Sequence, residues 1–433
     1  MNQYQLTKNE LEFVQKVQAD LAAKTKHNKI SIEKIAANFS VFNKNKIKEL
    51  TELAIVRIAR QISQRTDISD ILKYDLIVNL YNNQVNLSQR TSQSMLLQQY
   101  STPAPISYIA SLFVAQDDHS IYFEPSAGNG LLTIALPYEN TYVNELDDVR
   151  LANLYSQPFA IVTTQDATIP FTDYYKKFDG IVTNPPFGTL MEAENYDGFK
   201  IKTLDHLMSL RALDCMKDTG RAAIIIGGHT EWDEQGRIQA GKNRLFFNYL
   251  YSHYNVEDVI LIDGHKLYSR QGTSFNTRLI LINGRKQKIE GFSPLKNSLI
   301  SEIVSDFEKL WKRVFFAQAK VPANHEAKAQ ANSDIDIDNE IEVKKELNIL
   351  KLKLKLKAKA LDIDNSLSGY YYKKRGKLSA YTISDNCADI TDINTGIQEI
   401  RDAIKEREIM SQKIPYFFYI RLTKLQAKAL KLI

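Results

Sequence analysis

The sequence predicts an α/β protein in which a wound, mainly parallel sheet lies between helical segments. Between residues 120 and 285, short apolar runs alternate with turn residues and helical patterns, which is typical of repeated strand–helix units. Past Lys286 this alternation ends. Seven strands are predicted, at residues 121–123, 141–143, 159–163, 180–183, 222–226, 259–262 and 278–282.

The two flanks of this segment differ from it in composition. Residues 1–90 are rich in Lys, Gln, Asn, Ile and Leu, and apolar residues spaced three and four apart predict helices there. Residues 320–340 are polar and repetitive and predict a linker. Residues 350–361 alternate Leu with Lys, which fits strand or helix, and we favour helix; a helical tail follows Asn394. We therefore expect a helical N-terminal domain, a central α/β domain and a basic, mainly helical C-terminal region, at residues 1–92, 93–290 and 291–433.

Composition narrows the class of protein. With 433 residues, 44% of them hydrophobic, the chain can bury a substantial core. The two cysteines, Cys215 and Cys387, exclude a disulfide framework, and Cys215 is expected to be a buried, inert thiol. The first residues lack an apolar signal core, and no apolar stretch approaches the roughly 20 residues of a membrane span. We expect a soluble cytoplasmic protein with no membrane partner.

The distribution of charge suggests a polyanionic partner. Residues 1–100 carry 14 basic and 9 acidic side chains, residues 101–290 carry 17 and 23, and residues 291–433 carry 25 and 19. Basic flanks around an acidic centre suit a protein whose ends hold a nucleic acid while its centre binds something else. On charge alone, solvated surface lysines are an equally good interpretation.

A glycine-containing turn follows the first predicted strand, in the run Phe123-Glu124-Pro125-Ser126-Ala127-Gly128-Asn129-Gly130. Glycines between a strand and a helix let the backbone approach a ligand closely and direct free amides toward it. An isolated Gly-x-Gly is more often an ordinary tight turn. The position of this one favours a nucleotide-like ligand.

Two carboxylates strengthen that interpretation. Glu145 ends the second strand, where it can accept hydrogen bonds from both ribose hydroxyls, and Asp166 follows the third strand, where it can receive an adenine amino group. The chain has no phosphate-binding G-x-x-x-x-G-K-[ST] and no G-x-G-x-x-G after this strand. An adenosine without phosphates points to S-adenosylmethionine as the cofactor.

The tetrapeptide Asn184-Pro185-Pro186-Phe187 follows the fourth strand. The exocyclic amino group of adenine or cytosine is a poor nucleophile because its lone pair is delocalised into the ring. The Asn184 side-chain oxygen and the Pro185 carbonyl can accept its two hydrogens, while the prolines hold both acceptors rigidly. Phe187 offers a face on which an extruded base can stack. The alternative for an isolated N-P-P-F is a rigid turn that ends a strand.

Other chemistries fit less well. No Pro-Cys pair supplies a thiolate for attack on a pyrimidine ring, which disfavours cytosine C5 methylation. The seven histidines show no metal-ligand spacing, so no metal is expected, and His229 after the fifth strand is expected to be a structural or surface residue.

The run Tyr100-Ser101-Thr102-Pro103 lies ahead of the glycine motif. Together these motifs resemble the amino methyltransferases of DNA, in the group that carries such a Thr-Pro motif ahead of the glycine motif. The resemblance spans residues 95–285 and implies a Rossmann-like S-adenosylmethionine-dependent methyltransferase fold whose last strand is antiparallel. It extends to the modification subunits of type I restriction systems, which have a helical N-terminal domain, and to solitary methylases of phages and mobile elements.

The resemblance also implies roles for individual residues. It gives catalysis to Asn184, Pro185, Pro186 and Phe187. It gives cofactor binding to Tyr100, Thr102, Pro103, Glu124, Pro125, Ala127, Gly128, Gly130, Glu145 and Asp166, with the Thr-Pro motif at the methionine end. The run Gln271-Gly272-Thr273 would border the target base, so that Phe187, Gly272 and Thr273 contact it.

We therefore expect an enzyme that transfers a methyl group to N6 of adenine in DNA, with Lys373, Lys374 and Arg375 among the residues that hold the nucleic acid. N4-cytosine methylation uses the same tetrapeptide and stays open. Methylases of ribosomal RNA and tRNA, and glutamine methylases of release factors, have related motifs and rank lower. The chain can also be a modification subunit that needs a separate specificity subunit, or an idle homologue, which the intact tetrapeptide argues against.

Overall fold

The computed structural model describes residues 4–86, 101–271, 274–316, 373–374 and 377–378. The chain divides into two compact units, Met1–Pro322 and Ala323–Ile433. The predictions made for residues 320–340, residues 350–361 and the tail after Asn394 fall outside the described residues. The same is true of Tyr100, Gly272, Thr273, Arg375 and Cys387.

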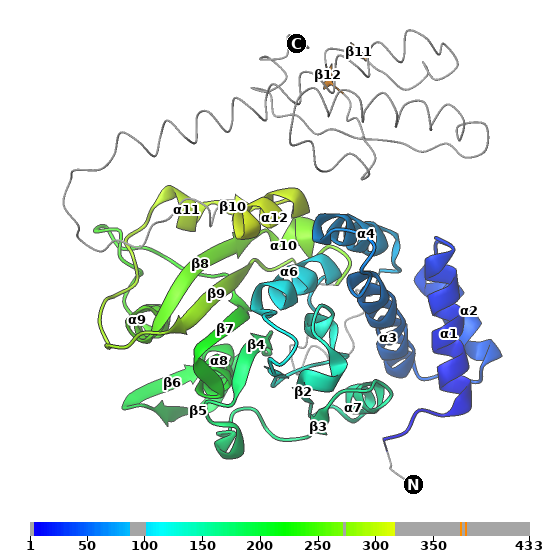
Figure 1. Cartoon of the computed structure of the whole chain (residues 1–433), viewed down its shortest axis with the longest axis horizontal. Helices are drawn as coiled ribbons and strands as arrows, with labels where there is room; N and C mark the ends of the chain where they lie inside the picture. Colours follow the sequence, from blue (N-terminus) through cyan, green and yellow to red (C-terminus); the bar gives the residue numbers. More distant parts are fainter. Residues whose placement is uncertain (1–3, 87–100, 272–273, 317–372, 375–376, 379–433) are drawn as a thin grey trace, which may run out of the picture. The chain divides into compact units, whose positions relative to one another are not determined.

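Within the described residues, the centre of the first unit is an eight-stranded sheet (Figure 1). Its strands, from one edge to the other, are β10 (Ile303–Val304), β8 (Tyr254–Ile262), β9 (Thr277–Arg285), β7 (Met216–Gly227), β4 (Phe178–Thr183), β1 (Tyr122–Glu124), β2 (Thr141–Asn144) and β3 (Ile161–Thr163). Strand β9 is antiparallel to both of its neighbours, and every other pairing is parallel. The seven predicted strands and the antiparallel last one are confirmed, and β10 is an addition from the C-terminal side.

The central strands are continuous apolar runs in the sequence because both of their faces are buried. In β7, Ala223 and Ile225 join the core on one face of the sheet, whereas Ala222, Ile224 and Ile226 join the core on the other. Successive side chains of a strand point to opposite faces, so a strand covered on both sides needs apolar residues at every position.

Helices cover both faces of the sheet. The first core includes α4 (Asp70–Asn83), α6 (Ala104–Val114) and α12 (Phe307–Phe315), whose rings pack closely, with Tyr74 and Trp311 centroids 4.8 Å apart. The second core includes α8 (Leu204–Asp214) and α9 (Lys242–His253). Helix α7 (Asp148–Tyr155) lies beside β3. The fold is thus a sheet between two helical layers.

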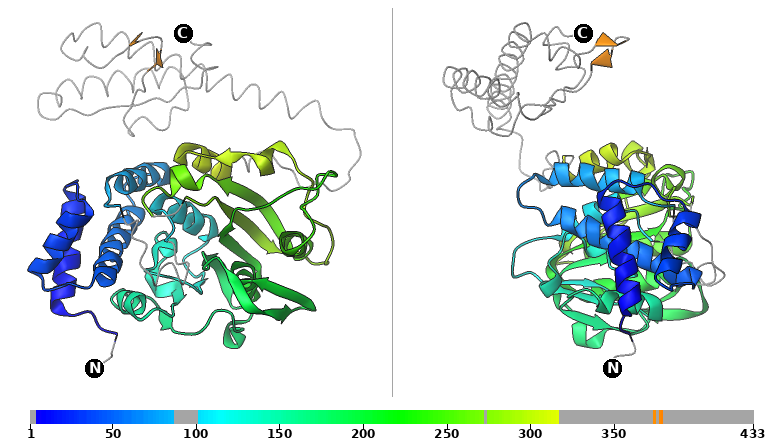
Figure 2. Two further views of the ribbon diagram at one scale, coloured as in Figure 1. Left: turned by 180° about the vertical axis from the view of Figure 1, so that it is seen from behind. Right: turned by 90° about the vertical axis from the view of Figure 1, so that its right-hand side faces the viewer.

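The N-terminal segment is helical, as predicted, and consists of α1 (Lys8–Ala22), α2 (Lys29–Asn38), α3 (Lys44–Ser63) and α4. Thr7 begins α1 with a reciprocal capping box to Glu10. Figures 1 and 2 show α1 and α2 on the outside, with α3 between them and the rest of the fold. The buried Arg60 of α3 donates to the Leu136 carbonyl and to the Thr133 hydroxyl, both at 2.5 Å. Helix α3 is therefore packed directly against the segment that follows β1.

A hairpin of β5 (Thr189–Tyr196) and β6 (Phe199–Thr203) follows the predicted catalytic tetrapeptide and was not expected. Its turn residues Asp197 and Gly198 have φ values of 47° and 82°, the pair of positive angles that a type I′ turn requires. The shorter elements of the described residues are η1 (Leu131–Thr133), η2 (Tyr138–Asn140), η3 (Thr172–Tyr174), α10 (Gly264–Leu267), α11 (Ser298–Ser301), β11 (Lys373–Lys374) and β12 (Lys377–Leu378).

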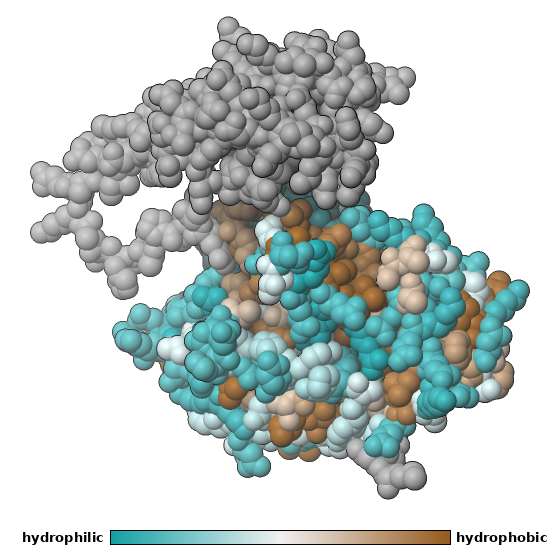
Figure 3. Space-filling model, turned by 45° about the vertical axis from the view of Figure 1, so that its right-hand side comes forward, coloured by the Kyte–Doolittle hydropathy of each residue, from teal (hydrophilic) through white to brown (hydrophobic). Residues whose placement is uncertain are grey.

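Polar and apolar areas alternate on the surface of the described residues, as Figure 3 shows for one side. Exposed apolar side chains are spread over separate elements, among them Phe42 before α3, Met191 in β5 and Phe292 after β9. Scattered exposure of this kind is normal for folded chains. No helix among the described residues has the length and apolar character to span a membrane.

Candidate functional site

A pocket of about 720 Å³ opens at the carboxyl ends of β1, β2, β3 and β4. Parallel strands bring residues that follow them to one edge of the sheet, which is where ligands bind in wound α/β folds. The volume falls within the range of ligand pockets. Of the predicted site residues, the lining contains Thr102, Glu124, Pro125, Ala127, Gly128, Glu145, Asp166, Asn184, Pro185, Pro186 and Phe187.

The glycine turn after β1 depends on backbone angles that favour glycine. Gly128 and Gly130 have φ values of 57° and 86°. A Cβ on Gly130 would lie 3.0 Å from the Phe159 ring, so this residue is needed for close packing beneath the turn. A Cβ on Gly128 would meet nothing within 4 Å, and its amide donates to the Glu145 carboxylate at 2.7 Å. Gly128 therefore faces the pocket, whereas Gly130 shapes the turn.

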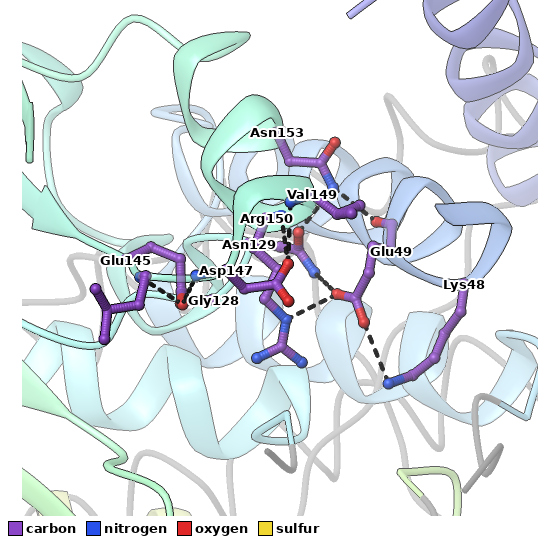
Figure 4. Close-up of polar contacts among 10 residues, drawn as sticks. Lys48, Glu49, Gly128, Asn129, Glu145, Asp147, Val149, Arg150 and Asn153 are labelled. Atoms are coloured by element: carbon purple, nitrogen blue, oxygen red, sulfur yellow. Dashed lines mark hydrogen bonds and ion pairs between the residues drawn. The ribbon is translucent and has the colours of Figure 1, made fainter. Parts of the chain in front are cut away.

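The Glu145 carboxylate is held by backbone amides (Figure 4). Besides Gly128, the amides of Leu146 and Asp147 both donate to its Oε1 atom at 2.9 Å. Asp147 in turn caps the first turn of α7, accepting from the amides of Val149 and Arg150. The carboxyl end of β2 and the start of α7 are thereby held together by hydrogen bonds to the buried Glu145 and to Asp147.

Asn144 joins the ends of three strands. Its side-chain nitrogen donates to the carbonyls of Pro125 at 3.0 Å and Gln165 at 2.8 Å, and its oxygen accepts from the Gln165 amide at 2.8 Å. Asp166, the next residue, is exposed and accepts from the Thr168 amide at 2.9 Å. Asp166 therefore lies at the exposed rim of the pocket.

The tetrapeptide Asn184–Phe187 forms another wall. The Asn184 side-chain nitrogen donates to the Thr102 hydroxyl at 2.9 Å, although the two residues are 82 positions apart. Because the nitrogen is used as a donor, the acceptor role of this amide belongs to its oxygen. The hydroxyls of Ser126 and Thr183 lie 3.0 Å apart, so the glycine turn and the end of β4 are also linked. The three motifs meet at one place.

Glu124 is buried, and its Oε2 atom has no hydrogen-bond partner among the described residues. Burial, together with the negative charge of Glu145, raises the pKa of Glu124 well above its usual range, and Arg60 offsets this in part. A carboxyl kept in this environment is poised to bind a donor or a cation from a ligand.

The raised pKa predicts a pH-dependent cost to folding. Glu124 ionises near its usual pKa of 4.5 in the unfolded chain but at a higher pH in the folded protein. Below pH 4.5 the carboxyl is protonated in both states, so folding carries no cost from its ionisation. As the pH rises from there toward the folded pKa, ionisation favours the unfolded chain and the folded protein loses stability. Glu124→Gln removes this loss. We expect the variant to exceed the natural protein in Tm by more at pH 8 than at pH 5, measured by thermal unfolding without ligand. Glu139→Gln, at an exposed position, is the control, and a gap that does not widen with pH would contradict the prediction.

A buried polar network behind the pocket was not predicted from the sequence. Glu49 of α3 accepts from the Arg150 guanidinium at 3.0 Å and from the Asn129 side chain at 2.8 Å. Asn153 of α7 donates to the Glu49 carbonyl at 3.1 Å. Although burial opposes it, the charges of Arg150 and Lys48 lower the pKa of Glu49 to about 2. The Glu49–Arg150 ion pair thereby joins α3 to α7, and the hydrogen bond from Asn129 joins α3 to the glycine turn (Figure 4).

Some predicted residues are not among those that line the pocket. Pro103 begins α6, and Gly130 packs beneath the turn. Lys373 and Lys374 form strand β11, in the second unit of the chain. His229 is an exposed residue, as expected. Cys215 is buried, and burial raises its pKa to about 12, which fits the inert thiol that was predicted.

The strand order, the antiparallel β9 and the pocket at the ends of β1, β2 and β4 define the fold of the class I S-adenosylmethionine-dependent methyltransferases. S-adenosylmethionine is the cofactor of this fold.

Comparison with known proteins gives distant relatives of this class. No family model matches the sequence. The chain is 24% identical over 202 residues to the type II methyltransferase M.AccI of Acinetobacter calcoaceticus, which corresponds to 42% of this chain and 35% of that protein. It therefore spans about a third of the length of this curated relative.

Two similar solved structures are a type I restriction–modification complex and a Listeria monocytogenes protein assigned to the class I S-adenosylmethionine-dependent methyltransferases. The first has a TM-score of 0.39 at 16% identity, with 75% of this chain and 78% of that chain covered. The second has a TM-score of 0.40 at 10% identity, with 70% of this chain and 98% of that chain covered.

Proposed function

We propose that this protein transfers a methyl group from S-adenosylmethionine to N6 of adenine in DNA. The observation that carries the proposal is the hydrogen bond between Asn184 and Thr102, which joins the tetrapeptide to the Thr-Pro motif beside the glycine turn. The similarity to a type II methyltransferase supports DNA as the substrate.

The pocket fits the cofactor. Glu124 ends β1, and Glu145 and Asp166 follow the neighbouring parallel strands β2 and β3. The Oε2 atom of buried Glu124 has no hydrogen-bond partner within the described residues, and a ligand would supply one. Glu145 would hold the ribose and Asp166 the adenine ring, with the amides of the glycine turn close to the ligand. Bound in this way, S-adenosylmethionine supplies an electrophilic methyl group.

The chain's own residues prepare the target amino group. The Asn184 side-chain oxygen and the Pro185 carbonyl would accept its two hydrogens, which draws the nitrogen toward tetrahedral geometry and frees its lone pair for attack. Phe187, which is half-buried in the pocket wall, would stack on the extruded base. The nitrogen would gain the methyl group as the S–C bond of the sulfonium breaks, which leaves S-adenosylhomocysteine, and it would give up one proton to solvent.

Replacing Glu145 should weaken cofactor binding. Glu145→Ala removes the ribose acceptor and the partner of three backbone amides. We expect a loss of about 1.5–3 kcal/mol in the binding free energy of S-adenosylhomocysteine, measured by calorimetry. An unchanged affinity would remove Glu145 from the site.

The proposal is tested by incubating the protein with radiolabelled S-adenosylmethionine and, separately, with unmethylated duplex DNA, single-stranded DNA and ribosomal RNA. Digestion of the products identifies the modified nucleoside. N6-methyladenine in DNA is expected. N4-methylcytosine, or label in RNA, would contradict the proposed substrate. Cofactor binding without transfer to any of the three substrates would favour a modification subunit that needs a specificity partner.

A further inference from the structure

We infer that Glu52 and Arg150 bind the amino acid part of S-adenosylmethionine, Glu52 its ammonium group and Arg150 its carboxylate. The inference rests on the cofactor proposed above. An α-amino acid carries one positive and one negative group on the same carbon. An acid and a cation that line the same pocket can bind both groups, and Glu52 and Arg150 both line this pocket and interact electrostatically.

Glu52 has the properties of an acid that lacks its partner. It belongs to α3, lines the pocket and is 2% exposed. Its Oε2 atom makes no hydrogen bond within the described residues, and its carboxyl is hydrogen-bonded to the Ser101 side chain. A buried carboxylate oxygen without a partner is costly unless a ligand completes it. The α-ammonium group has three N–H donors and a positive charge, which is what this oxygen lacks.

Arg150 offers the complementary charge. It follows the N-cap Asp147 in the first turn of α7 and also lines the pocket. Its Nε atom donates to Glu49, and Figure 4 shows its two terminal nitrogens directed away from that carboxylate. Within the described part of the chain, the Arg150 side chain donates a hydrogen bond from its Nε atom and none from its two terminal nitrogens. A guanidinium edge of this kind suits a carboxylate.

The position of Glu52 fits the methionine end of the cofactor. Its partner Ser101 precedes Thr102, whose hydroxyl accepts from Asn184. Glu145 and Asp166, the proposed ligands of the ribose and the adenine, follow β2 and β3 instead. The amino acid chain would thus extend past Asn184 toward α3, with the methyl group beside the tetrapeptide.

The charges around Glu52 favour a cation as its ligand. Burial and the neighbouring Glu49 carboxylate raise the pKa of Glu52, while Lys48 of the same helix and Arg150 of α7 lower it in part. These groups leave the Glu52 carboxylate less well stabilised than that of Glu49, which holds its own ion pairs. A bound ammonium group would supply the missing positive charge.

Calorimetry with four ligands tests the inference on the full chain. The ligands are S-adenosylhomocysteine, its deamino analogue, its decarboxy analogue and 5′-methylthioadenosine, which lacks the amino acid altogether. We expect the natural protein to bind the first about 10- to 100-fold more tightly than either the deamino or the decarboxy analogue, the range for hydrogen bonds to charged groups. Glu52→Gln should lose this preference over the deamino analogue and keep its affinity for 5′-methylthioadenosine. Arg150→Lys, which keeps a charge for Glu49, should narrow the preference over the decarboxy analogue.

Glu145→Gln is the matched control, because it changes another buried acid of the same pocket and should weaken all four ligands alike. Thermal unfolding confirms that each variant is folded, and Glu52→Asp replaces Glu52→Gln if the latter is not. The inference is overturned if Glu52→Gln weakens the amino and deamino ligands equally, or neither. If the natural protein binds none of the four, the proposed cofactor itself is wrong; if it binds them all equally, only this inference fails.

Discussion

Asn184→Ala is expected to lower the rate of methyl transfer by on the order of 10²–10³-fold, the usual effect of removing one group that stabilises a transition state. The variant loses the amide oxygen that would accept a hydrogen from the target amino group, and it also leaves the Thr102 hydroxyl without its donor. The pocket walls formed by Glu124, Glu145 and the glycine turn are unchanged. Affinity for S-adenosylhomocysteine should therefore stay near normal.

Single-turnover transfer of labelled methyl groups measures the first effect, and calorimetry measures the second. Asn184→Asp is an informative companion, because it keeps an acceptor oxygen but cannot donate to Thr102 while ionised. If Asn184→Ala loses cofactor affinity together with activity, the residue shapes the cofactor pocket and its assignment to the amino group is wrong.

Glu49→Ala is expected to have the largest effect on stability, a loss of about 3–5 kcal/mol in the free energy of unfolding. The substitution leaves the buried Arg150 charge without its ion pair and the Asn129 side chain without its acceptor. Because Asn129 and Arg150 both line the pocket, cofactor affinity should fall as well.

Chemical denaturation measures this loss, and Glu12→Ala provides the comparison. The Lys8–Glu12 pair lies within the N-terminal helix α1, its side chains are 88% and 45% exposed, and its charged atoms are 3.7 Å apart. Removing such a pair costs about 1 kcal/mol or less. Equal destabilisation by the two variants would mean that the Glu49 network contributes no more than a surface contact.

The sheet was predictable from the sequence because its strands are covered on both faces. Runs such as the one around Ile224 are apolar at every position, and turn residues separate them. The β5–β6 hairpin was missed because its side chains are mostly exposed, so burial imposes no such pattern on it. A local signal was nevertheless present in Asp197-Gly198, the dipeptide that favours a type I′ turn.

The pocket residues that follow strands were predictable for a related reason. Parallel strands bring Glu124, Glu145 and Asn184 to one edge whatever the details of packing. No such rule applies to Glu49 and Glu52, which belong to a helix, and Glu49 contacts Arg150 across 101 positions of the chain. Their one signal is their place among buried apolar residues of α3, where an acid is costly unless something pairs with it.

The buried Glu49–Arg150 ion pair between α3 and α7 also constrains how this protein can evolve by recombination. A helical segment that merely sat beside a catalytic sheet could be exchanged for another by recombination, with function kept. Here Glu49 accepts from Asn129 of the glycine turn and Glu52 lines the pocket, so a foreign segment would arrive without that acceptor and without that carboxyl group. The N-terminal helices and the sheet should therefore be inherited together, and chimaeras joined near residue 92 should fail unless both acids come with the new helices.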